Sequence, residues 1–427
     1  MHASHAQQFA SSPLRQRYEK IRDTTLELTE PYSAEDQMLQ SMPDASPAKW
    51  HLAHTTWFFE TFILSAYVPG YRSFNPEFRH LFNSYYKQLG SHPLRGSRGL
   101  MSRPSLEKVH AYRSWVDDAM LRYVDGGEIG DGTAALIELG VNHEQQHQEL
   151  ILTDLKHALW SMPLRPESVR RPRAVSSAPP LEWITFDGGI HQIGHVGGGF
   201  SFDNEGPRHE ALLQSFRLAS RAVSNAEYVE FMRDGGYQRP ELWLSDGWDT
   251  VRAQGWNSPL YWERNGDAEP WLEFTFSGVQ EVDPSAPVCH VSFYEADAFA
   301  RWSDARLPRE EEWEIAAVEA ALTSDSSESQ QGTFQEDGVF HPQPARGAGL
   351  QQLFGDVWEW TASPYLGYPG FQPAPGLVGE YNGKFMCNQF VLRGGSCATP
   401  ASHIRATYRN FFPPHARWQF MGIRLAK

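Results

Sequence analysis

Two histidines four residues apart raise the possibility of a metal site. The stretch GVNHEQQHQEL carries His143 and His147, with Glu144 directly after the first of them. Residues four apart on a helix lie one turn above each other, so the two imidazoles face the same side and can share an ion. The same letters match the HExxH pattern of zinc peptidases, in which the glutamate is the general base. A helical pair of this kind is also often structural, so further ligands must decide.

A second apolar segment, WHLAHTTWFFETF, carries His51 and His54 three residues apart. One imidazole from this helix would complete a three-histidine set in the core of a helix bundle, where cofactor sites are commonly built. Three neutral imidazoles leave open positions on iron(II) for substrate and dioxygen, a variation on the two-histidine, one-carboxylate site.

The peptidase interpretation needs a third ligand after the helix. The segment HEQQHQELILTD lacks the later Gly and His of the metzincin extension. The one later carboxylate at a plausible distance, Glu167, falls in a stretch of linker composition. We therefore expect oxygen chemistry rather than peptide hydrolysis.

The elements that must position these residues fall into two halves of different character. Residues 12–163 show long apolar-periodic stretches with few internal Gly or Pro, which predict a helix bundle. Residues 164–180 are rich in Pro, Ser and Arg and predict a linker. Residues 181–427 consist of short runs broken by Gly and Pro, which predict an irregular α+β domain.

Within the second half, two brief helical patterns cover Asn225 to Arg233 and Tyr294 to Ala305. The polar stretch from Ser324 to Gly338 predicts an exposed loop. No internal repeat of 20 to 50 residues is visible.

Composition narrows the class of protein further. The 427 residues include 15 Trp, 16 Tyr and 25 Phe, which is typical of a globular protein with a large aromatic core. A formal charge of −15 argues against nucleic acid as a partner, because backbone phosphates demand a surplus of Lys and Arg. Three cysteines cannot make a disulfide framework, and no apolar run matches a membrane span or signal peptide. We expect a cytoplasmic protein without a membrane partner.

The two histidine segments together resemble the DinB-type bundle of the sulfoxide synthases of ergothioneine biosynthesis. In that family an HxxxH pair and one upstream histidine hold iron(II). The resemblance implies that His54, His143 and His147 are the ligands. It leaves His51 to pack or to make a hydrogen bond behind the site.

Motifs of the second half, including GGIHQIG, GDVWEW, RGGS and GIRLA, resemble the formylglycine-generating-enzyme fold. The resemblance covers nearly the whole chain. It implies an α plus α+β architecture, with a DinB-like four-helix bundle at residues 12–163. A C-type-lectin-like, formylglycine-generating-enzyme-like (sulfatase-modifying factor) domain would follow at residues 181–427.

The second domain is also compatible with two other functions. A formylglycine-generating oxidase needs paired cysteines after the RGGS turn, but that region holds Cys397 alone. Cys289, Cys387 and Cys397 are therefore expected to be small apolar fillers. A non-catalytic lectin-like binding module is the other alternative, and the three histidines argue against it.

The reaction implied by the resemblance joins the sulfur of a cysteine-type thiol to C2 of the imidazole of hercynine. It uses dioxygen and leaves a sulfoxide. Tyr85 and Tyr86 resemble a tyrosine pair of one branch of the family and suit the role of proton donor, although packing is the alternative for one of them. Arg95 and Arg98 could grip the carboxylate of the thiol substrate, or could be solvated surface residues.

Hercynine itself would need an amide partner and aromatic faces. Gln146 could hydrogen-bond its imidazole, or be an ordinary helix-surface amide. The resemblance assigns Asn410, Phe411 and Phe412 to the hercynine pocket, where aromatic faces suit a trimethylammonium group. Phe412 stands where the branch that uses γ-glutamylcysteine has an acidic residue, so free cysteine is favoured. A selenium-inserting relative, a selenoneine synthase, stays open.

Overall fold

The computed structural model describes residues 13–84, 93–127, 129–169, 177–266, 270–323, 332–374 and 377–427. It divides the chain into two compact units, Met1–Leu155 and Lys156–Lys427. The division falls inside one long helix, α6 (Asp131–Ser161). Among the described residues, no helix has both the length and the apolar character that crossing a membrane requires.

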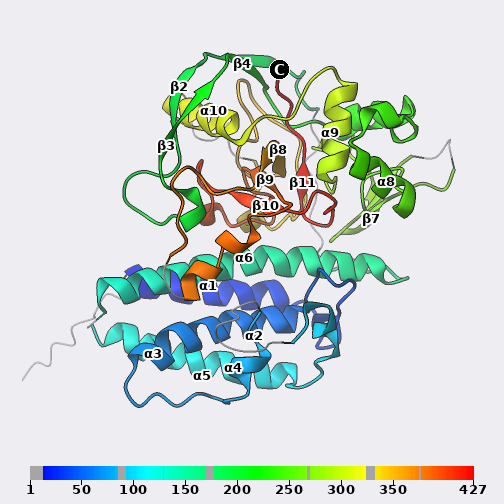
Figure 1. Ribbon diagram of the computed structural model, residues 1–427. Helices are drawn as coiled ribbons and strands as arrows, with labels where there is room; N and C mark the ends of the chain where they lie inside the picture. The colour runs from blue at the N-terminus through cyan, green and yellow to red at the C-terminus, as the bar shows by residue number, and fades with distance from the viewer. Residues whose placement is uncertain are drawn as a thin grey trace, which may run out of the picture. The chain divides into compact units, whose positions relative to one another are not determined.

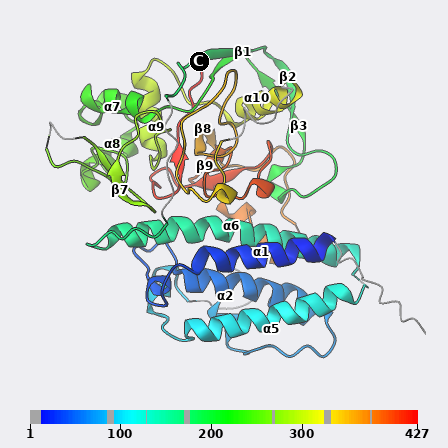
Figure 2. The ribbon, with the colours of Figure 1, turned by 180° about the vertical axis from the view of Figure 1, so that it is seen from behind.

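Four long helices dominate the first unit and lie side by side in Figures 1 and 2. They are α1 (Pro13–Thr29), α2 (Ala48–Phe59), α5 (Leu106–Asp125) and the first part of α6. Shorter turns follow α2, namely the π-helical η2 (Glu60–Leu64), α3 (Ser65–Tyr67) and α4 (Phe78–Leu81). Ser105 caps the N-terminus of α5, because its hydroxyl accepts the Lys108 backbone N–H at 3.2 Å.

Helix α2 is buried on every side. All of its residues from Ala48 to Phe59 are shielded from solvent, so it shows no polar face. Two of these residues are His51 and His54. Polar side chains in such a position must find partners inside the protein, because an unpaired buried polar group is costly.

A buried charge cluster ties α6 to two other helices. Glu144 accepts hydrogen bonds from Arg22 of α1 at 2.9 Å and from Arg113 of α5, and Thr25 adds a third at 2.7 Å. Burial alone would raise the pKa of Glu144, but the charges and hydrogen bonds of Arg113 and Arg22 lower it to about 2. Glu144 is therefore an anion that holds three helices together.

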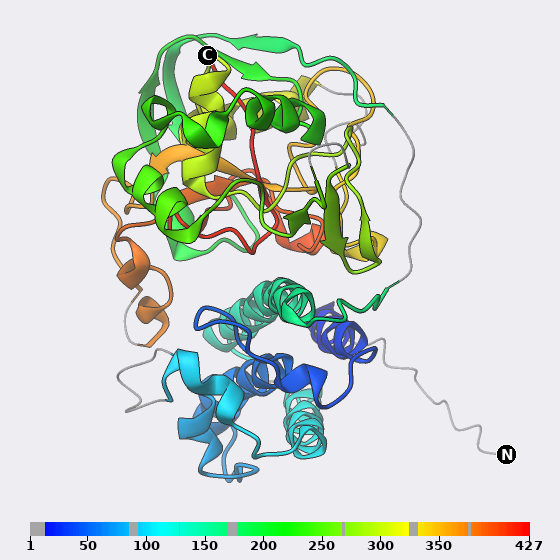
Figure 3. The same ribbon diagram turned by 90° about the vertical axis from the view of Figure 1, so that its right-hand side faces the viewer.

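The second unit is built on small sheets (Figures 1 and 3). Its central four-stranded sheet has the order β10-β9-β8-β11, antiparallel except for the β8–β11 pair. These strands are β8 (Trp358–Pro364), β9 (Phe390–Arg393), β10 (Asn410–Phe412) and β11 (Met421–Gly422). The smaller sheets pair β1 (Trp183–Phe186) with β4 (Phe216–Ala219), β2 (Gly189–Ile193) with β3 (His209–Leu213), and β6 (Leu272–Thr275) with both β5 (Trp262–Glu263) and β7 (Gly278–Glu281).

The helices of this unit are more numerous than the sequence pattern indicated. Both expected helices are present, as α7 (Asn225–Arg233) and α9 (Phe293–Trp302). Two more, α8 (Ser245–Gln254) and α10 (Glu310–Thr323), were not expected. Helix α10 has no amphipathic period in its sequence because it is buried on more than one side. Trp313, Ala316 and Ala317 are all buried.

Two expectations for the second unit hold only in part. In the stretch 324–338, whose residues 332–338 are described, Glu336 and Asp337 are exposed as expected, but Phe334 and Gln335 are buried. Gln335 is held there because its side chain donates to the Ala398 carbonyl at 3.0 Å and its backbone N–H donates to Thr399. Cys387 is exposed and is no apolar filler, whereas Cys289 and Cys397 are buried as expected.

The charge cluster around Glu144 generates a stability prediction. Glu144→Gln keeps the shape of the side chain but leaves two buried guanidinium groups short of a carboxylate. We expect it to lower the free energy of unfolding by about 3 kcal/mol, as for other broken buried ion pairs. Urea unfolding followed by circular dichroism measures the loss. Glu138→Gln, which removes the half-exposed partner of Arg17, is the control and should cost about 1 kcal/mol or less. Equal losses in the two variants would contradict the role given to Glu144.

Candidate metal centre

Three imidazoles from two helices converge in the first unit. One ring nitrogen each of His54, His143 and His147 lies within 4.8 Å of the others. All three residues are buried, with exposures of 0%, 2% and 8%. In the part of the chain that the structure describes, no other set of three His, Cys, Asp or Glu residues meets the same test. The histidine of α2 that joins the pair on α6 is thus His54 rather than His51.

His54 is held rigidly in this group. Its Nδ1 lies 2.6 Å from the carbonyl oxygen of Phe82. Its ring is stacked between Trp50, at a centroid distance of 4.5 Å, and Trp57, at 5.3 Å. The positions 50, 54 and 57 lie on one face of α2, so the helix itself builds the stack. His54 Nε2 is buried and has no hydrogen-bond partner in the described part of the chain.

Burial keeps the three imidazoles uncharged. It lowers the pKa of His143 to about 3, and it lowers the pKa of His54 and His147 well below the usual value for histidine. A neutral imidazole carries a lone pair that can bind a metal. Together with the unpartnered Nε2 of His54, this donor set fits an ion that accepts nitrogen ligands, such as iron or zinc.

Glu144 does not belong to the centre, although it directly follows His143. Its side chain lies among Arg22, Arg113 and Thr25, which occupy both of its oxygens. A general base of a peptidase needs a carboxylate free to take a proton from water. This arrangement therefore speaks against the HExxH peptidase interpretation.

His51 and Asp154 lie behind the centre. The Nδ1 atoms of His51 and His147 are 2.7 Å apart, and His51 Nε2 lies 3.2 Å from Asp154 Oδ2. Asp154 was not singled out in the sequence. The signal that could have found it is its position seven residues after His147, two turns along the same helix face.

Of the two arginines predicted to bind substrate, one is buried and one exposed. Both lie on η4 (Arg95–Leu100), a 3₁₀-helix. Arg95 is exposed and donates to the Asp44 carbonyl. Arg98 is 6% exposed, donates to Ser46 Oγ at 2.9 Å, and lies over the ring of Trp50 with 3.4 Å between Cζ and the ring centroid.

Arg98 is a buried cation without an ion pair among the described residues. No carboxylate of a described residue forms a salt bridge with it. Burial, with a smaller contribution from the nearby charge of Arg95, lowers the pKa of its guanidinium to about 9, although Asp154 acts in the opposite direction. The stack runs from Arg98 through Trp50 to His54, which links this charge to the imidazole group. An anionic ligand would stabilise Arg98.

Three other residues of the first unit were predicted to act on the substrates, namely Gln146, Tyr85 and Tyr86. Gln146 is half-buried on α6, between His143 and His147 in sequence. Tyr85 and Tyr86 lie outside the described residues. Their role as proton donors stays a prediction.

The predicted hercynine residues form β10 in the second unit and are all half-buried. Asn410 Oδ1 accepts the Phe411 N–H at 2.9 Å. Phe411 stacks on Tyr365 at 4.0 Å, and Phe412 meets Trp418 edge to face at 5.7 Å. Phe411 also stacks on Phe385 at 5.9 Å. Both rings thus pack on aromatic neighbours and keep part of their surface exposed.

Directly before β10, a buried ion-pair cluster fixes the strand. Arg409 binds Glu310 through Nε at 2.8 Å and Nη2 at 2.9 Å, and Arg393 of β9 binds the same carboxylate at 2.9 Å. Burial would raise the pKa of Glu310, but the two arginines lower it. These ion pairs hold the backbone directly before Asn410 in place.

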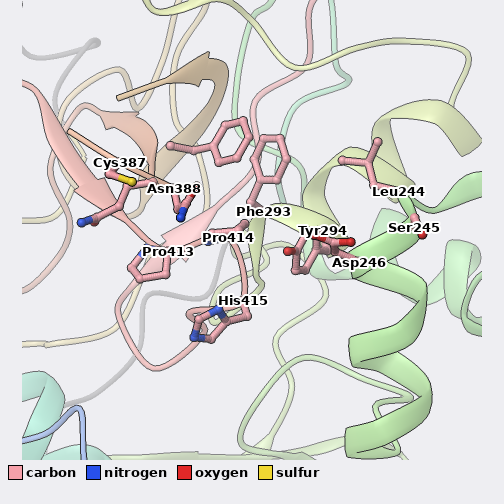
Figure 4. A pocket seen from close by; sticks show the side chains of 12 residues that line it. Leu244, Ser245, Asp246, Phe293, Tyr294, Cys387, Asn388, Pro413, Pro414 and His415 are labelled. Carbon is pink, nitrogen blue, oxygen red and sulfur yellow. The ribbon is translucent and has the colours of Figure 1, made fainter. Parts of the chain in front are cut away.

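The second unit also contains a cavity of about 580 Å³, shown in Figure 4. The rings of Phe293 and Phe390 stack at 3.8 Å in its wall, and Asp246, His415 and the exposed thiol of Cys387 line it as well. None of the residues predicted for hercynine or the thiol lines this cavity.

Comparisons with known proteins extend over both units. Residues 170–427 match the family of the sulfatase-modifying factor enzyme 1-like domain. The hercynine oxygenase of Mycobacterium tuberculosis is 30% identical over 95% of this chain and 96% of its own length, and that of Mycolicibacterium smegmatis is 31% identical with the same coverage. The formylglycine-generating enzyme of Bos taurus is 23% identical over 58% of this chain and 75% of its own. Because the two oxygenases match nearly the full length, the chain belongs to the hercynine oxygenase family of enzymes and carries a sulfatase-modifying-factor-like domain at its C-terminal end.

Proposed function

We propose that this enzyme is an iron(II)- and dioxygen-dependent sulfoxide synthase of ergothioneine biosynthesis. It joins the sulfur of cysteine to C2 of the imidazole of hercynine. The observation that carries the proposal is the buried group of three neutral imidazoles, His54, His143 and His147. We further propose that the helices of the first unit form a DinB-like four-helix bundle around these ligands.

The proposed reaction balances without a further reductant. The thiol loses its S–H hydrogen and the imidazole loses its C2–H hydrogen as the carbon–sulfur bond forms, which releases two electrons. Oxidation of the sulfur to the sulfoxide releases two more. These four electrons reduce one dioxygen, whose atoms end in the sulfoxide and in one water molecule.

The three imidazoles would hold the iron and leave its remaining positions to ligands from outside the protein. Iron(II), when bound, supplies a site where a thiolate and dioxygen meet and exchange electrons. The protein contributes rigidity, because His54 is stacked between Trp50 and Trp57 and its Nδ1 lies against a backbone carbonyl. Such fixed ligands keep their geometry whatever substrate binds.

Arg98 would bind the carboxylate of the thiol substrate. It is buried and forms no salt bridge with a described residue, and its guanidinium fork matches a carboxylate in shape and charge. Arg95 would add to the local positive charge from the surface. Phe412, in place of an acidic residue, favours cysteine over γ-glutamylcysteine.

The residues that would bind hercynine and supply protons are assigned by resemblance to the family. Gln146 would hydrogen-bond the imidazole of hercynine, and Asn410, Phe411 and Phe412 would contact the rest of the molecule. The phenols of Tyr85 and Tyr86 would deliver the proton that accompanies oxygen reduction.

One experiment tests the function as a whole. The full chain is reconstituted with iron(II) without air and then mixed with hercynine, dioxygen and one donor at a time: cysteine, γ-glutamylcysteine or a selenosugar. We expect the mass of the cysteine–hercynine sulfoxide as the main product. A product from γ-glutamylcysteine or the selenosugar alone would correct the donor. No turnover with any donor, together with bound hercynine, would favour the non-catalytic binding module.

The ligand set generates the first functional prediction. His143→Ala removes one of three protein ligands and leaves a weak two-point site, so we expect loss of nearly all bound iron. Iron per chain after anaerobic reconstitution and desalting measures this. His110→Ala, on the exposed face of α5, should keep the wild-type content. Full iron content and activity in His143→Ala would refute the assignment.

His51 and His54 should respond differently to the same change. His54→Ala should lose iron as His143→Ala does, whereas His51→Ala should be milder because His51 is no ligand. If His51→Ala lost the metal and His54→Ala kept it, the ligand of α2 would be the other histidine.

The role of Arg98 predicts a defect in substrate binding. Arg98→Gln should raise KM for cysteine about 10- to 100-fold, the worth of one or two hydrogen bonds to a charged group. Its kcat should change little, because the interaction is equal in ground and transition states. Arg95→Gln is the matched control and should have a smaller effect, since that side chain is exposed. Equal effects on KM would show that Arg98 makes no special contact with cysteine.

The tyrosine pair should influence the course of the reaction more than binding. If either phenol steers the reaction toward carbon–sulfur bond formation, its Phe variant should keep iron and bind both substrates. Oxidation of the thiol alone to a sulfinic acid should then rise. The ratio of sulfoxide to sulfinate in Tyr85→Phe, Tyr86→Phe and the double variant measures this. An unchanged ratio and rate in all three would leave both tyrosines with a packing role.

A further inference from the structure

His51 and His147 are joined nitrogen to nitrogen between α2 and α6. Their Nδ1 atoms lie 2.7 Å apart, and both rings are buried. A hydrogen bond between two ring nitrogens needs the hydrogen on one ring and a lone pair on the other. The tautomer of His51 therefore dictates the tautomer of His147.

Asp154 sets the direction of this pair. Its Oδ2 lies 3.2 Å from His51 Nε2 and also accepts the backbone N–H of Ser46 at 2.8 Å. An ionised carboxylate can only accept hydrogen bonds. His51 must then donate from Nε2, which leaves the lone pair of a neutral ring on its Nδ1. His147 in turn donates from Nδ1 and keeps its own lone pair on Nε2.

His54 reaches the same tautomer by a different route. Its Nδ1 faces the Phe82 carbonyl at 2.6 Å, and a carbonyl oxygen can only accept. Its lone pair is therefore on Nε2, which is buried and has no hydrogen-bond partner among the residues that the structure describes. Two of the three imidazoles thus carry hydrogen on Nδ1 and offer Nε2 to an ion. The Phe82 carbonyl imposes this tautomer on His54. The side chains of His51 and Asp154 impose it on His147.

We propose that Asp154 and His51 are positioning residues, which hold His147 in the Nε2-ligating tautomer and fix the orientation of its ring. The inference rests on the proposed metal site. Groups that orient a ligating histidine typically contribute 10- to 100-fold to metal affinity, and we expect about that range here. The two residues act in series, since Asp154 reaches His147 through His51.

A purely structural role would also bury these residues, so the test must separate shape from hydrogen bonding. His51→Phe keeps an aromatic ring, somewhat larger than the imidazole, but it cannot accept the hydrogen of His147 Nδ1. His51→Asn is smaller, yet its amide oxygen can take the place of the ring Nδ1 as acceptor. Packing predicts that Phe is the better replacement. The positioning role predicts that Asn is.

The experiment titrates the metal-free full-length chain with Co(II), whose visible absorption reports both affinity and coordination. We expect His51→Phe to weaken Co(II) binding about 10- to 100-fold and to alter the spectrum. His51→Asn should recover much of the affinity and the wild-type band shape. Equal or tighter binding by His51→Phe would overturn the inference. Circular dichroism of each metal-free variant checks that it is folded.

Asp154→Leu tests the series arrangement. Alone it should weaken Co(II) binding, because nothing then forces His51 to present its lone pair to His147. Added to His51→Phe, it should cause little further loss, since the link to His147 is already broken. Independent, additive losses in the double variant, or wild-type affinity in Asp154→Leu, would also overturn the inference.

The controls separate this inference from the function on which it rests. His110→Phe and Asp118→Leu make the same changes at exposed positions of α5 and should bind Co(II) like the wild type. His143→Ala should bind almost none. If the wild-type chain fails to bind Co(II), the proposed metal site is wrong and the inference falls with it. If the wild type binds and the variants of His51 and Asp154 match it, the inference alone fails.

Discussion

The burial of neutral imidazoles inside a helix bundle is the constraint on which the first unit depends. Removing a polar ring from water is costly unless each nitrogen finds a partner. Backbone carbonyl, imidazole and carboxylate supply partners on the outer side of the group, at Phe82, His51 and Asp154. The nitrogens that face one another would bind the proposed metal ion. The fold thus brings together three residues that could serve as its ligands.

The same rule governs the charges around this group. Glu144 directly follows His143, a proposed ligand, yet it lies among Arg22 and Arg113 and holds α1, α5 and α6 together. Helix α6 therefore presents the proposed ligands on one face and a structural anion on another. In the second unit, Glu310 binds two arginines in the same manner next to β10. Paired buried charges stiffen both scaffolds, and sites on stiff elements keep their geometry.

Arg98 differs from the other buried cations named here, because it forms no salt bridge with a described residue. Its neighbours are an aromatic ring and one hydroxyl, which only partly replace the water lost on burial. A carboxylate brought by a substrate would complete this environment. A buried cation without a carboxylate partner favours an anionic ligand. It also lowers the stability of the protein when no ligand is bound.

From the sequence alone, the HxxxH spacing on α6, the helical first half and the irregular second half could be predicted, because helical periodicity and Gly/Pro punctuation are local properties of the chain. Local pattern could not find α10, since burial on several sides removes its amphipathic period. It could not predict that Asp154 contacts His51, or that Glu144 pairs with Arg22 and Arg113, either. Which groups meet across helices depends on how α1, α2, α5 and α6 pack, and a contact between residues 51 and 147 has no trace in local spacing. The residue types and their periodicity were determined by the sequence, whereas the hydrogen-bond partners of each buried group were decided by tertiary packing.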